Sequence, residues 1–287
     1  MDLDSVGTQY AGYARDYAGF ARAAVRRSPA VIELPSSQLA VHARAFPVGA
    51  PGPTALAEHV ATGGTGRLWA DRAVHPRALA VDCAGHVLLR GDPAALSPDA
   101  LAPLAGRYIE APDRFLPVLG ASFGPVVPWE RMVYVRQEAP VADPRPPRGV
   151  TVRRLNPADA PELAALDPDS AWIHASWGGP VGLAASGYGW GAFHKGRLAA
   201  VACSYFVGSA YEDIAAVTAP DQRRRQLALA CVAGLCADVA ARGRGASWSC
   251  SRHNRPSRLL AWNAGFRLVR EYTHYATAAH SPRLRAA

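Results

Sequence analysis

Apolar residues recur with two different periods along the chain, and together they predict a mixed α/β protein. In the first half, spacings of three and four residues predict helices, and short apolar runs bounded by turn residues predict strands. The helices are expected at residues 8–27, 54–60 and 97–105, and the strands at 68–69, 78–82, 86–90 and 132–136. Ala84 and Gly85 separate two of these strands and indicate a hairpin.

The pattern becomes more regular after residue 149, where it predicts the order β-α-β-β-β-α-β-α-β. Strands are expected at residues 150–155, 190–194, 197–207, 211–218, 246–251 and 266–275, and helices at 156–166, 227–241 and 257–263. This order is not the strict alternation of strand and helix that a doubly wound parallel sheet requires.

A proline-rich stretch divides the two patterns. Residues 139–149, with the sequence APVADPRPPRG, contain four prolines, which neither continue a helix nor pair within a sheet. A chain of 287 residues is long enough for two domains. We therefore expect a smaller α/β domain at 1–138, a linker at 139–149 and a second domain of the α/β (α+β) class at 150–287.

Composition excludes several classes of protein. Hydrophobic residues make up 49% of the chain and charged residues 19%, which is typical of a globular protein. No apolar run approaches the roughly 20 residues of a membrane span, and the N-terminus lacks the apolar core of a signal peptide. The five cysteines form no C-x-x-C pair, which favours buried, reduced thiols. We expect a soluble, cytoplasmic protein without a membrane partner or a bound metal.

The positive charge is concentrated at one end of the chain. The whole chain carries a net charge of +8, yet residues 221–287 alone carry twelve arginines against Asp221, Asp238 and Glu271, a net charge of +9. This concentration indicates a polyanionic partner, either a phosphate-rich cofactor or a nucleic acid.

One stretch of this segment has the features of an anion site. A strand is expected to end at Thr218, Pro220 makes a turn, and a helix is expected to begin at Leu227. The first turn of a helix has backbone N–H groups without an intrahelical partner, and its dipole favours negative charge. The arginines at 223–225 add positive charge at the same place, which suits a pyrophosphate.

With these residues the chain resembles the GNAT superfamily of acyl-CoA-dependent N-acyltransferases. The family's strand, V-x-x-P turn and [Q/R]-x-x-G-x-[G/A] helix start are matched by Val217, Pro220, Arg223 and Ala228. Its second motif, N-x-x-[A/S] followed by G-F, is similar to Asn254, Ser257 and Gly265-Phe266. The resemblance covers about 150–275 and implies a mixed, mostly antiparallel sheet flanked by helices. Residues before the linker resemble a degenerate GNAT-like half that covers the acceptor cleft.

The resemblance implies acetyl-CoA or another acyl-CoA as the donor substrate. The residues that it places at the donor are Val217, Thr218, Arg223, Arg224, Arg225, Gln226, Leu227, Ala228, Asn254 and Ser257. Three positions depart from the family pattern. Gln226 replaces the motif glycine, Arg224 stands where glycine is frequent, and Ala261 replaces the frequent tyrosine acid, so the leaving thiolate would take its proton elsewhere or from solvent.

Acylation of an amine needs a base that removes a proton from the ammonium group. Glu212 lies eleven residues before Arg223 on the strand that leads to the anion loop, where many GNAT proteins carry the base. Asp213 is the alternative and points to the opposite face of a regular strand. Both carboxylates could also be surface or capping groups.

The segment between the first helix and the second strand of the GNAT-like half is expected to contact the acceptor. His174 and Trp177 lie in this segment beside a Gly-Gly-Pro turn, and we expect them at the substrate. His174 could shuttle a proton or could be a structural histidine.

The leading hypothesis is an N-acyltransferase that moves an acyl group, most simply acetyl, from acyl-CoA to a small-molecule amine in a ternary complex. One alternative keeps the fold and uses aminoacyl-tRNA as the donor, bound by the arginine-rich C-terminal segment. A second alternative is a non-catalytic GNAT-like binding module. The sequence sets no oligomeric state.

Overall fold

The computed structural model describes residues 30–63, 65–141 and 143–277. The helix expected at residues 8–27 lies outside this range. The described strands form one 12-stranded sheet with the order β1-β2-β3-β4-β5-β12-β6-β11-β10-β9-β8-β7. The sheet is therefore continuous across both parts of the chain.

The first part of the chain builds one end of this sheet. Its strands are β1 (Ile32–Leu34), β2 (Arg67–Ala70), β3 (Ala78–Cys83), β4 (His86–Gly91), β5 (Tyr108–Glu110) and β6 (Val127–Arg136). Its helices are α2 (Ala55–Ala61) and α3 (Leu116–Phe123), with 3-10 helices at Ser36–Ala40, Ala43–Ala45, Pro93–Ala95, Pro98–Leu104 and Asp113–Phe115. The hairpin between β3 and β4 turns at Ala84 and Gly85, whose φ angles of 52° and 82° fit a tight hairpin turn.

The second part of the chain builds the other end. Its strands are β7 (Val150–Arg154), β8 (Gly189–His194), β9 (Arg197–Val207), β10 (Tyr211–Thr218), β11 (Gly245–Ser251) and β12 (Phe266–Ala276). Its helices are α4 (Ala160–Ala164), α5 (Pro180–Ser186), α6 (Leu227–Ala241) and α7 (Arg255–Asn263), with 3-10 helices at Pro157–Asp159, Ala171–Trp177 and Pro220–Gln222.

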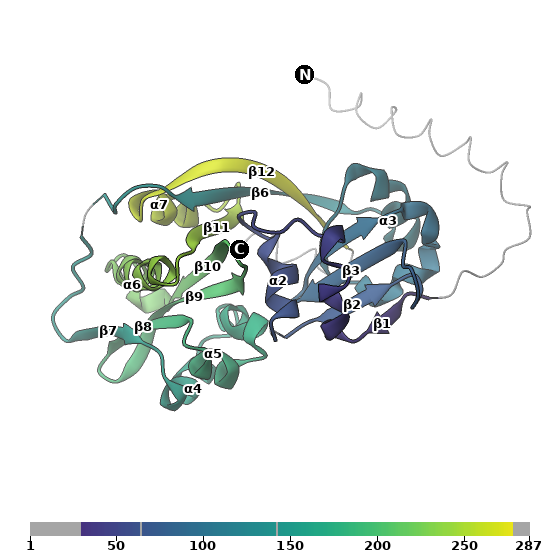
Figure 1. Ribbon diagram of the computed structural model, residues 1–287. Helices are drawn as coiled ribbons and strands as arrows, with labels where there is room; N and C mark the ends of the chain where they lie inside the picture. The colour runs from purple at the N-terminus through teal and green to yellow at the C-terminus, as the bar shows by residue number, and fades with distance from the viewer. Residues whose placement is uncertain (1–29, 64, 142, 278–287) are drawn as a thin grey trace, which may run out of the picture.

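The two parts repeat one plan. Each begins with antiparallel strands, then has a parallel pair, β4 with β5 in the first part and β10 with β11 in the second. Each part then sends its last strand to the other part: β6 pairs with β11, and β12 pairs with β5. β6 and β12 also pair with each other and run side by side across the top of Figure 1. The structure therefore has the organisation of a tandem duplication with exchanged last strands.

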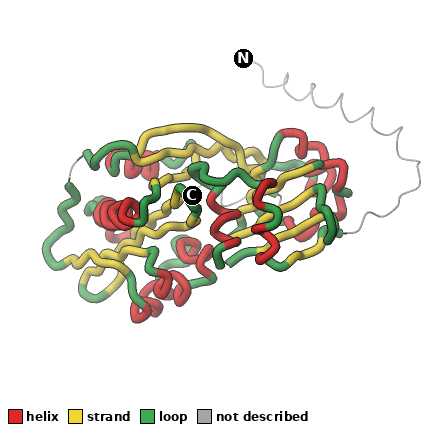
Figure 2. Tube along the Cα trace, viewed as in Figure 1, coloured by secondary structure: helices red, strands yellow, loops and turns green. Residues whose placement is uncertain are grey.

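Helices cover both faces of the sheet (Figure 2). One face packs on α6 and α7 in the second part and on α3 and Pro98–Leu104 in the first. The other face packs on α2, α4 and α5, and its apolar cluster takes buried residues from both parts, such as Leu56 and Leu163. The two parts therefore share a core. All five cysteines lie in the described residues and are buried as free thiols.

Most of the elements expected after residue 149 are confirmed, because their apolar periods are long and regular. Strands β9 and β10 and helix α6 have the expected bounds. Helix α5 and the 3-10 helix before it were not expected; the glycines at 178–179 and the proline after them start a new helix rather than a loop. β6 begins at Val127, five residues before the expected start. The division of the chain at 139–149 stays a prediction: no helix or strand is described there, yet β6 precedes it and lies within the second part's end of the sheet.

Candidate active site

Strands β10 and β11 separate along their length and open a gap in the sheet. They pair only from Tyr211 to Ile214 on β10 and from Gly245 to Trp248 on β11. Beyond this point β10 stays paired with β9 up to Thr218, and β11 stays paired with β6 up to Ser251. Val217 and Thr218 therefore lie where the β11 side of β10 has no strand partner in the described residues.

The loop that follows β10 leads into the longest helix of the described residues. Pro220–Gln222 forms a 3-10 turn, and Arg224 and Gln226 have φ angles of 62° and 59°, which reverse the chain twice before α6. Gln226 is the residue before α6 and makes no side-chain cap. The N–H groups of the first turn, which include those of Leu227 and Ala228, stay available to an anion.

Three arginines surround this helix start. Arg223 and Arg224 are exposed and Arg225 is half-buried, with its guanidinium donating a hydrogen bond to the Gln222 side chain. In the described residues none of the three has a carboxylate oxygen within 4.0 Å. Their charge therefore adds to the positive end of the α6 dipole.

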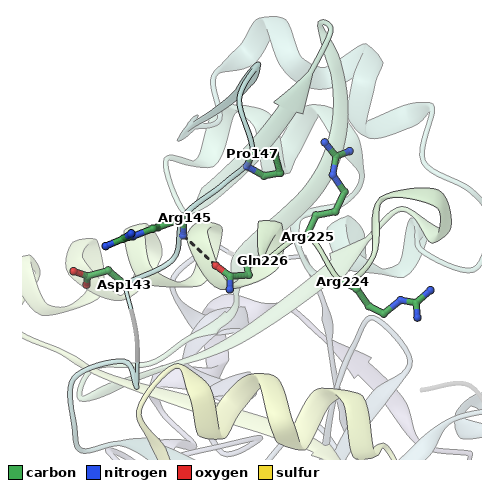
Figure 3. A pocket seen from close by; sticks show the side chains of 6 residues that line it. All are labelled: Asp143, Arg145, Pro147, Arg224, Arg225 and Gln226. Carbon is green, nitrogen blue, oxygen red and sulfur yellow. Dashed lines mark hydrogen bonds between the residues drawn. The ribbon is translucent and has the colours of Figure 1, made fainter.

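The proline-rich stretch at 139–149, the predicted linker, lies against the same loop. The Oε1 atom of Gln226 accepts a hydrogen bond of 3.1 Å from the backbone N–H of Arg145. Figure 3 shows the amide of Gln226 facing the linker, while the guanidinium groups of Arg224 and Arg225 point away from Asp143. The pocket between loop and linker has a volume of about 640 Å³. Gln226 thus takes the left-handed backbone conformation that suits glycine and uses its side chain to hold the linker.

Asp213 lies on β10 just before the strands separate. Its carboxylate is 5% exposed and accepts hydrogen bonds from the hydroxyls of Ser247 (2.8 Å) and Ser249 (3.1 Å) on β11. Burial raises the pKa of Asp213 to about 6, although the two serine hydrogen bonds and the charges of Arg131 and Arg270 act to lower it. A carboxylate with this pKa is mostly ionised at neutral pH and is suited to accept a proton.

Glu212 lies on the opposite face of β10 and has a different environment. Its side chain is fully buried, and its Oε1 and Oε2 accept hydrogen bonds of 2.7 Å each from Nε and Nη2 of Arg242. Arg244 donates a further bond of 3.1 Å, and the Ser204 hydroxyl donates another. Both carboxylate oxygens of Glu212 are thus already engaged by Arg242, Arg244 and Ser204, and this arrangement suits a structural ion pair.

Asn254 and Ser257 have structural hydrogen bonds. The Asn254 side chain caps α7 by accepting the backbone N–H of Ser257 at 3.1 Å. The Ser257 hydroxyl accepts the indole N–H of Trp248 at 3.0 Å. In the structure, the residues of the second sequence motif therefore stabilise the start of α7 through these two hydrogen bonds.

His174 and Trp177 lie in the 3-10 helix before α5. Trp177 donates its indole N–H to the backbone carbonyl of Ser204 at 3.0 Å and stacks on Tyr188 at 5.2 Å. His174 is half-buried, burial lowers its pKa, and its Nδ1 has no hydrogen-bond partner in the described residues. Trp177 therefore packs as a core residue, and His174 is kept neutral.

The sequence analysis missed a polar strip that extends from Asp213 across the exchanged strands. Arg131 on β6 donates to the backbone carbonyl of Ser249 at 3.2 Å, and Tyr272 and His274 follow on β12. Burial lowers the pKa of His274 well below its usual value, and the charges of His86 and Arg131 act in the same direction. The only signal in the sequence is the alternation of serine at 247, 249 and 251, which marks a polar face on β11.

Comparison with known proteins agrees with this arrangement. Residues 141–275 match the family described as GNAT acetyltransferase. A curated protein of Streptomyces virginiae, named "Uncharacterized N-acetyltransferase in mutA 5'region", is 62% identical over 216 residues, which cover 75% of this chain and 91% of that protein. The chain belongs to the GNAT acetyltransferase family. It is an enzyme of the N-acetyltransferase class.

Solved GNAT structures share the fold over most of the chain. A GCN5-related N-acetyltransferase-like protein from Streptococcus suis has a TM-score of 0.65 at 21% identity and covers 85% of this chain and 99% of its own. A tandem GNAT protein from the clavulanic acid biosynthesis pathway has a TM-score of 0.52 at 15% identity, with 86% and 96% covered. The GNAT fold is thus shown, and the comparisons favour neither an aminoacyl-tRNA transferase nor a non-catalytic module.

The described residues contain neither a membrane-spanning helix nor a metal-binding cluster. No helix in them is long and apolar enough to cross a membrane. No three His, Cys, Asp or Glu side chains within 30–63, 65–141 and 143–277 are grouped so that they could hold a metal ion.

Proposed function

We propose that this GNAT enzyme transfers an acetyl group from acetyl-CoA to the amine of a small molecule, with Asp213 as the general base. The observation that carries the proposal is the gap between β10 and β11, which has an arginine-rich helix start at one end and Asp213 at the other. The phosphates of the donor would bind at the helix start, and its thioester would lie nearer to Asp213.

The loop before α6 supports the donor assignment. The N–H groups of the first turn of α6 and the guanidiniums of Arg223, Arg224 and Arg225 would hold the pyrophosphate. On the open edge of β10, the backbone N–H of Thr218, next to Val217, points away from β9 and would polarise the thioester carbonyl. Asn254 and Ser257 already have partners, so their part is to fix α7 beside this gap.

The reaction requires two protons to leave the acceptor nitrogen. Asp213 would accept the first from the ammonium group, directly or through a water, and the neutral amine would attack the thioester carbon. A C–N bond forms, the C–S bond breaks, and the remaining proton leaves the nitrogen as the amide forms. Ala261 is fully buried and has no proton to give, so the leaving thiolate would take its proton from water.

Direct transfer in a ternary complex is favoured over an acyl-enzyme. The thiols of Cys83 and Cys231 are buried, and burial raises the pKa of each to about 12. A protonated, buried thiol is a poor nucleophile. Each of the other three cysteines is also buried, and burial raises its pKa.

The arginine-rich segment gives little support to tRNA as the donor. Arg242 and Arg244 pair with Glu212, Arg252 pairs with Glu130 and Glu271, and Arg267 pairs with Glu138. Carboxylates of this chain therefore neutralise part of the positive charge that is concentrated in residues 221–287.

The donor is tested by thermal unfolding of the full chain with acetyl-CoA. A ligand that binds only the folded state stabilises by about 2.7 kcal/mol at a concentration of 100 Kd. We expect acetyl-CoA to raise the melting temperature and dephosphorylated pantetheine to raise it less. No shift at millimolar acetyl-CoA would reject the proposed donor.

A further inference from the structure

Arg131 is a buried cation that forms no ion pair in the described residues and interacts with the buried carboxyl of Asp213 only at a longer distance. The residue is 8% exposed, donates to the Ser249 carbonyl at 3.2 Å and to the Tyr272 hydroxyl at 3.4 Å, and lies 4.2 Å from the ring centroid of Trp129. In the part of the chain that the structure describes, no carboxylate oxygen lies within 4.0 Å of its guanidinium. Buried charges in proteins are ordinarily paired, so this one calls for an anionic partner.

Arg270 is a second such cation on the same face of the sheet. It is half-buried, donates to the backbone carbonyl of Pro51 at 3.3 Å, and lies 5.3 Å from the ring of Tyr272. Within the described ranges it too has no carboxylate oxygen at ion-pair distance. Arg131 and Arg270 therefore both lie next to Tyr272 and place two positive charges beside it.

Both arginines lie close to the proposed base. Ser249 links the two sides: its carbonyl accepts from Arg131, and its hydroxyl donates to Asp213 at 3.1 Å. The positive charges of Arg131 and Arg270 act to lower the pKa of Asp213. A cation site and a proton acceptor therefore both contact Ser249, and a ligand that carries a carboxylate and an amine on neighbouring atoms could reach both.

Unsatisfied polar atoms in the same strip point to a polar ligand. His274 is 1% exposed, and neither of its ring nitrogens has a hydrogen-bond partner in residues 30–63, 65–141 and 143–277. The indole nitrogen of Trp129 is likewise buried without a partner there. The His274 ring lies 5.0 Å from Tyr272 and 6.1 Å from Trp129. Buried polar atoms without partners are rare in folded proteins and mark places where a bound group completes the hydrogen bonding.

We propose that the acceptor is an amino acid, or another amine with a carboxylate beside it, and that Arg131 and Arg270 bind that carboxylate. This inference rests on the proposed function, because it assigns the second substrate of the same site. Arg131 and Arg270 would hold the carboxylate while Asp213 takes a proton from the neighbouring ammonium group. The two arginines act by binding and orienting the acceptor, not by transferring a proton.

The first experiment uses the unaltered protein and matched acceptors. Acetylation rates with acetyl-CoA are measured for the twenty amino acids and for the amines that result when tyrosine, tryptophan, phenylalanine and histidine lose their carboxylate. A site built to bind a group rejects the analogue that lacks it strongly, so we expect kcat/KM to be at least about 100-fold lower for the decarboxylated partner of any accepted amino acid.

The second experiment changes the arginines. Arg270→Gln and Arg131→Gln are each expected to raise KM for the accepted amino acid at least about 10-fold, because the carboxylate contact is lost. The rate with the decarboxylated partner is expected to change by a smaller factor, which reflects only the lost charge that acts on the pKa of Asp213. Arg131→Lys keeps the charge and is expected to restore part of the affinity. Arg252→Gln, which removes an arginine that pairs with Glu130 and Glu271, is the matched control.

The outcomes separate this inference from the proposed function. If decarboxylated amines are acetylated as well as amino acids, or if acetyl-CoA stabilises the protein and no amino acid is acetylated, the carboxylate site is rejected and the donor assignment stands. If acetyl-CoA causes no shift in melting temperature and no amine is acetylated, both fail. A melting temperature of Arg270→Gln close to that of the unaltered protein excludes misfolding as the cause of a raised KM.

Discussion

A crossover connects the two strands of each parallel pair in the sheet, and the two crossovers differ in how their first helix begins. Between β10 and β11 the chain passes through a loop with three arginines and the 15-residue helix α6, whose start has no side-chain cap. Between β4 and β5 it passes through two short 3-10 helices, and the first is capped by the carboxylate of Asp92, which accepts the N–H of Ala94 at 2.9 Å. The same topology therefore has an uncapped helix start beside three arginines in one part of the molecule and a helix start capped by a carboxylate in the other.

The crossover between β4 and β5 has a carboxylate at the position where the other crossover has arginines. Asp92 also pairs with Arg77, and the Ala94 N–H bond and this arginine lower the pKa of Asp92. A carboxylate at this position takes the place that a phosphate would need. The first part keeps its share of the common core and contributes β6, with Arg131, to the other part's site.

The largest expected effect comes from the proposed base. Asp213→Asn removes the proton acceptor and is expected to lower kcat by about 10²- to 10⁴-fold. In the unaltered enzyme kcat/KM should rise as pH increases through about 6, because the ionised fraction of Asp213 grows there. The rise should be absent in the variant. Asp92→Asn, in the crossover between β4 and β5, is the matched control and should leave both kcat and the pH profile unchanged.

The arginines of the two crossovers should also differ in their effect on the donor. Replacement of Arg224 and Arg225 by Gln is expected to raise Kd for CoA by about 10-fold or more, since a hydrogen bond to a charged group contributes about 1.5–3 kcal/mol. Arg77→Gln in the other crossover should leave Kd unchanged. Equal losses of affinity in the two variants would remove the contrast between the crossovers.

Glu212 should affect stability rather than proton transfer. Glu212→Gln leaves Arg242 and Arg244 without their shared carboxylate. We expect it to lower the free energy of unfolding by about 3 kcal/mol. This value is at the low end of the range for a broken buried ion pair, because both arginines reach solvent. Denaturant titration gives this value. The rise of kcat/KM through pH 6 should persist in the variant, and its disappearance would return Glu212 to the mechanism.

The smallest effect is expected at Gln226, which replaces the glycine of the family motif in the loop before α6. Gln226→Gly removes the cost of a left-handed backbone at a non-glycine residue and also removes the hydrogen bond to Arg145, so the free energy of unfolding should change by less than about 1 kcal/mol. CoA affinity should stay equal or rise. A loss of affinity would show that the amide of Gln226 itself contacts the donor.

The sequence predicted the regular elements and the turn before α6, because long apolar periods and a proline are local signals. It could not predict that β6 crosses into the other part's sheet, since strand exchange depends on contacts between residues more than a hundred positions apart. For the same reason the sequence analysis missed Arg131, Tyr272 and His274. Its preference for Glu212 over Asp213 followed chain spacing and stays a prediction, since the ion pairs of Glu212 with Arg242 and Arg244 become visible only in three dimensions.

We expect the crossover between β10 and β11 to bind the donor and the crossover between β4 and β5 not to bind it. Isothermal titration of the full chain with CoA distinguishes the two crossovers. We expect one CoA per chain, with a Kd that is raised by about 10-fold or more in the Arg224→Gln, Arg225→Gln double variant. Two equivalents per chain, or an unchanged Kd in the double variant, would show that the β10–β11 crossover is not the single donor site.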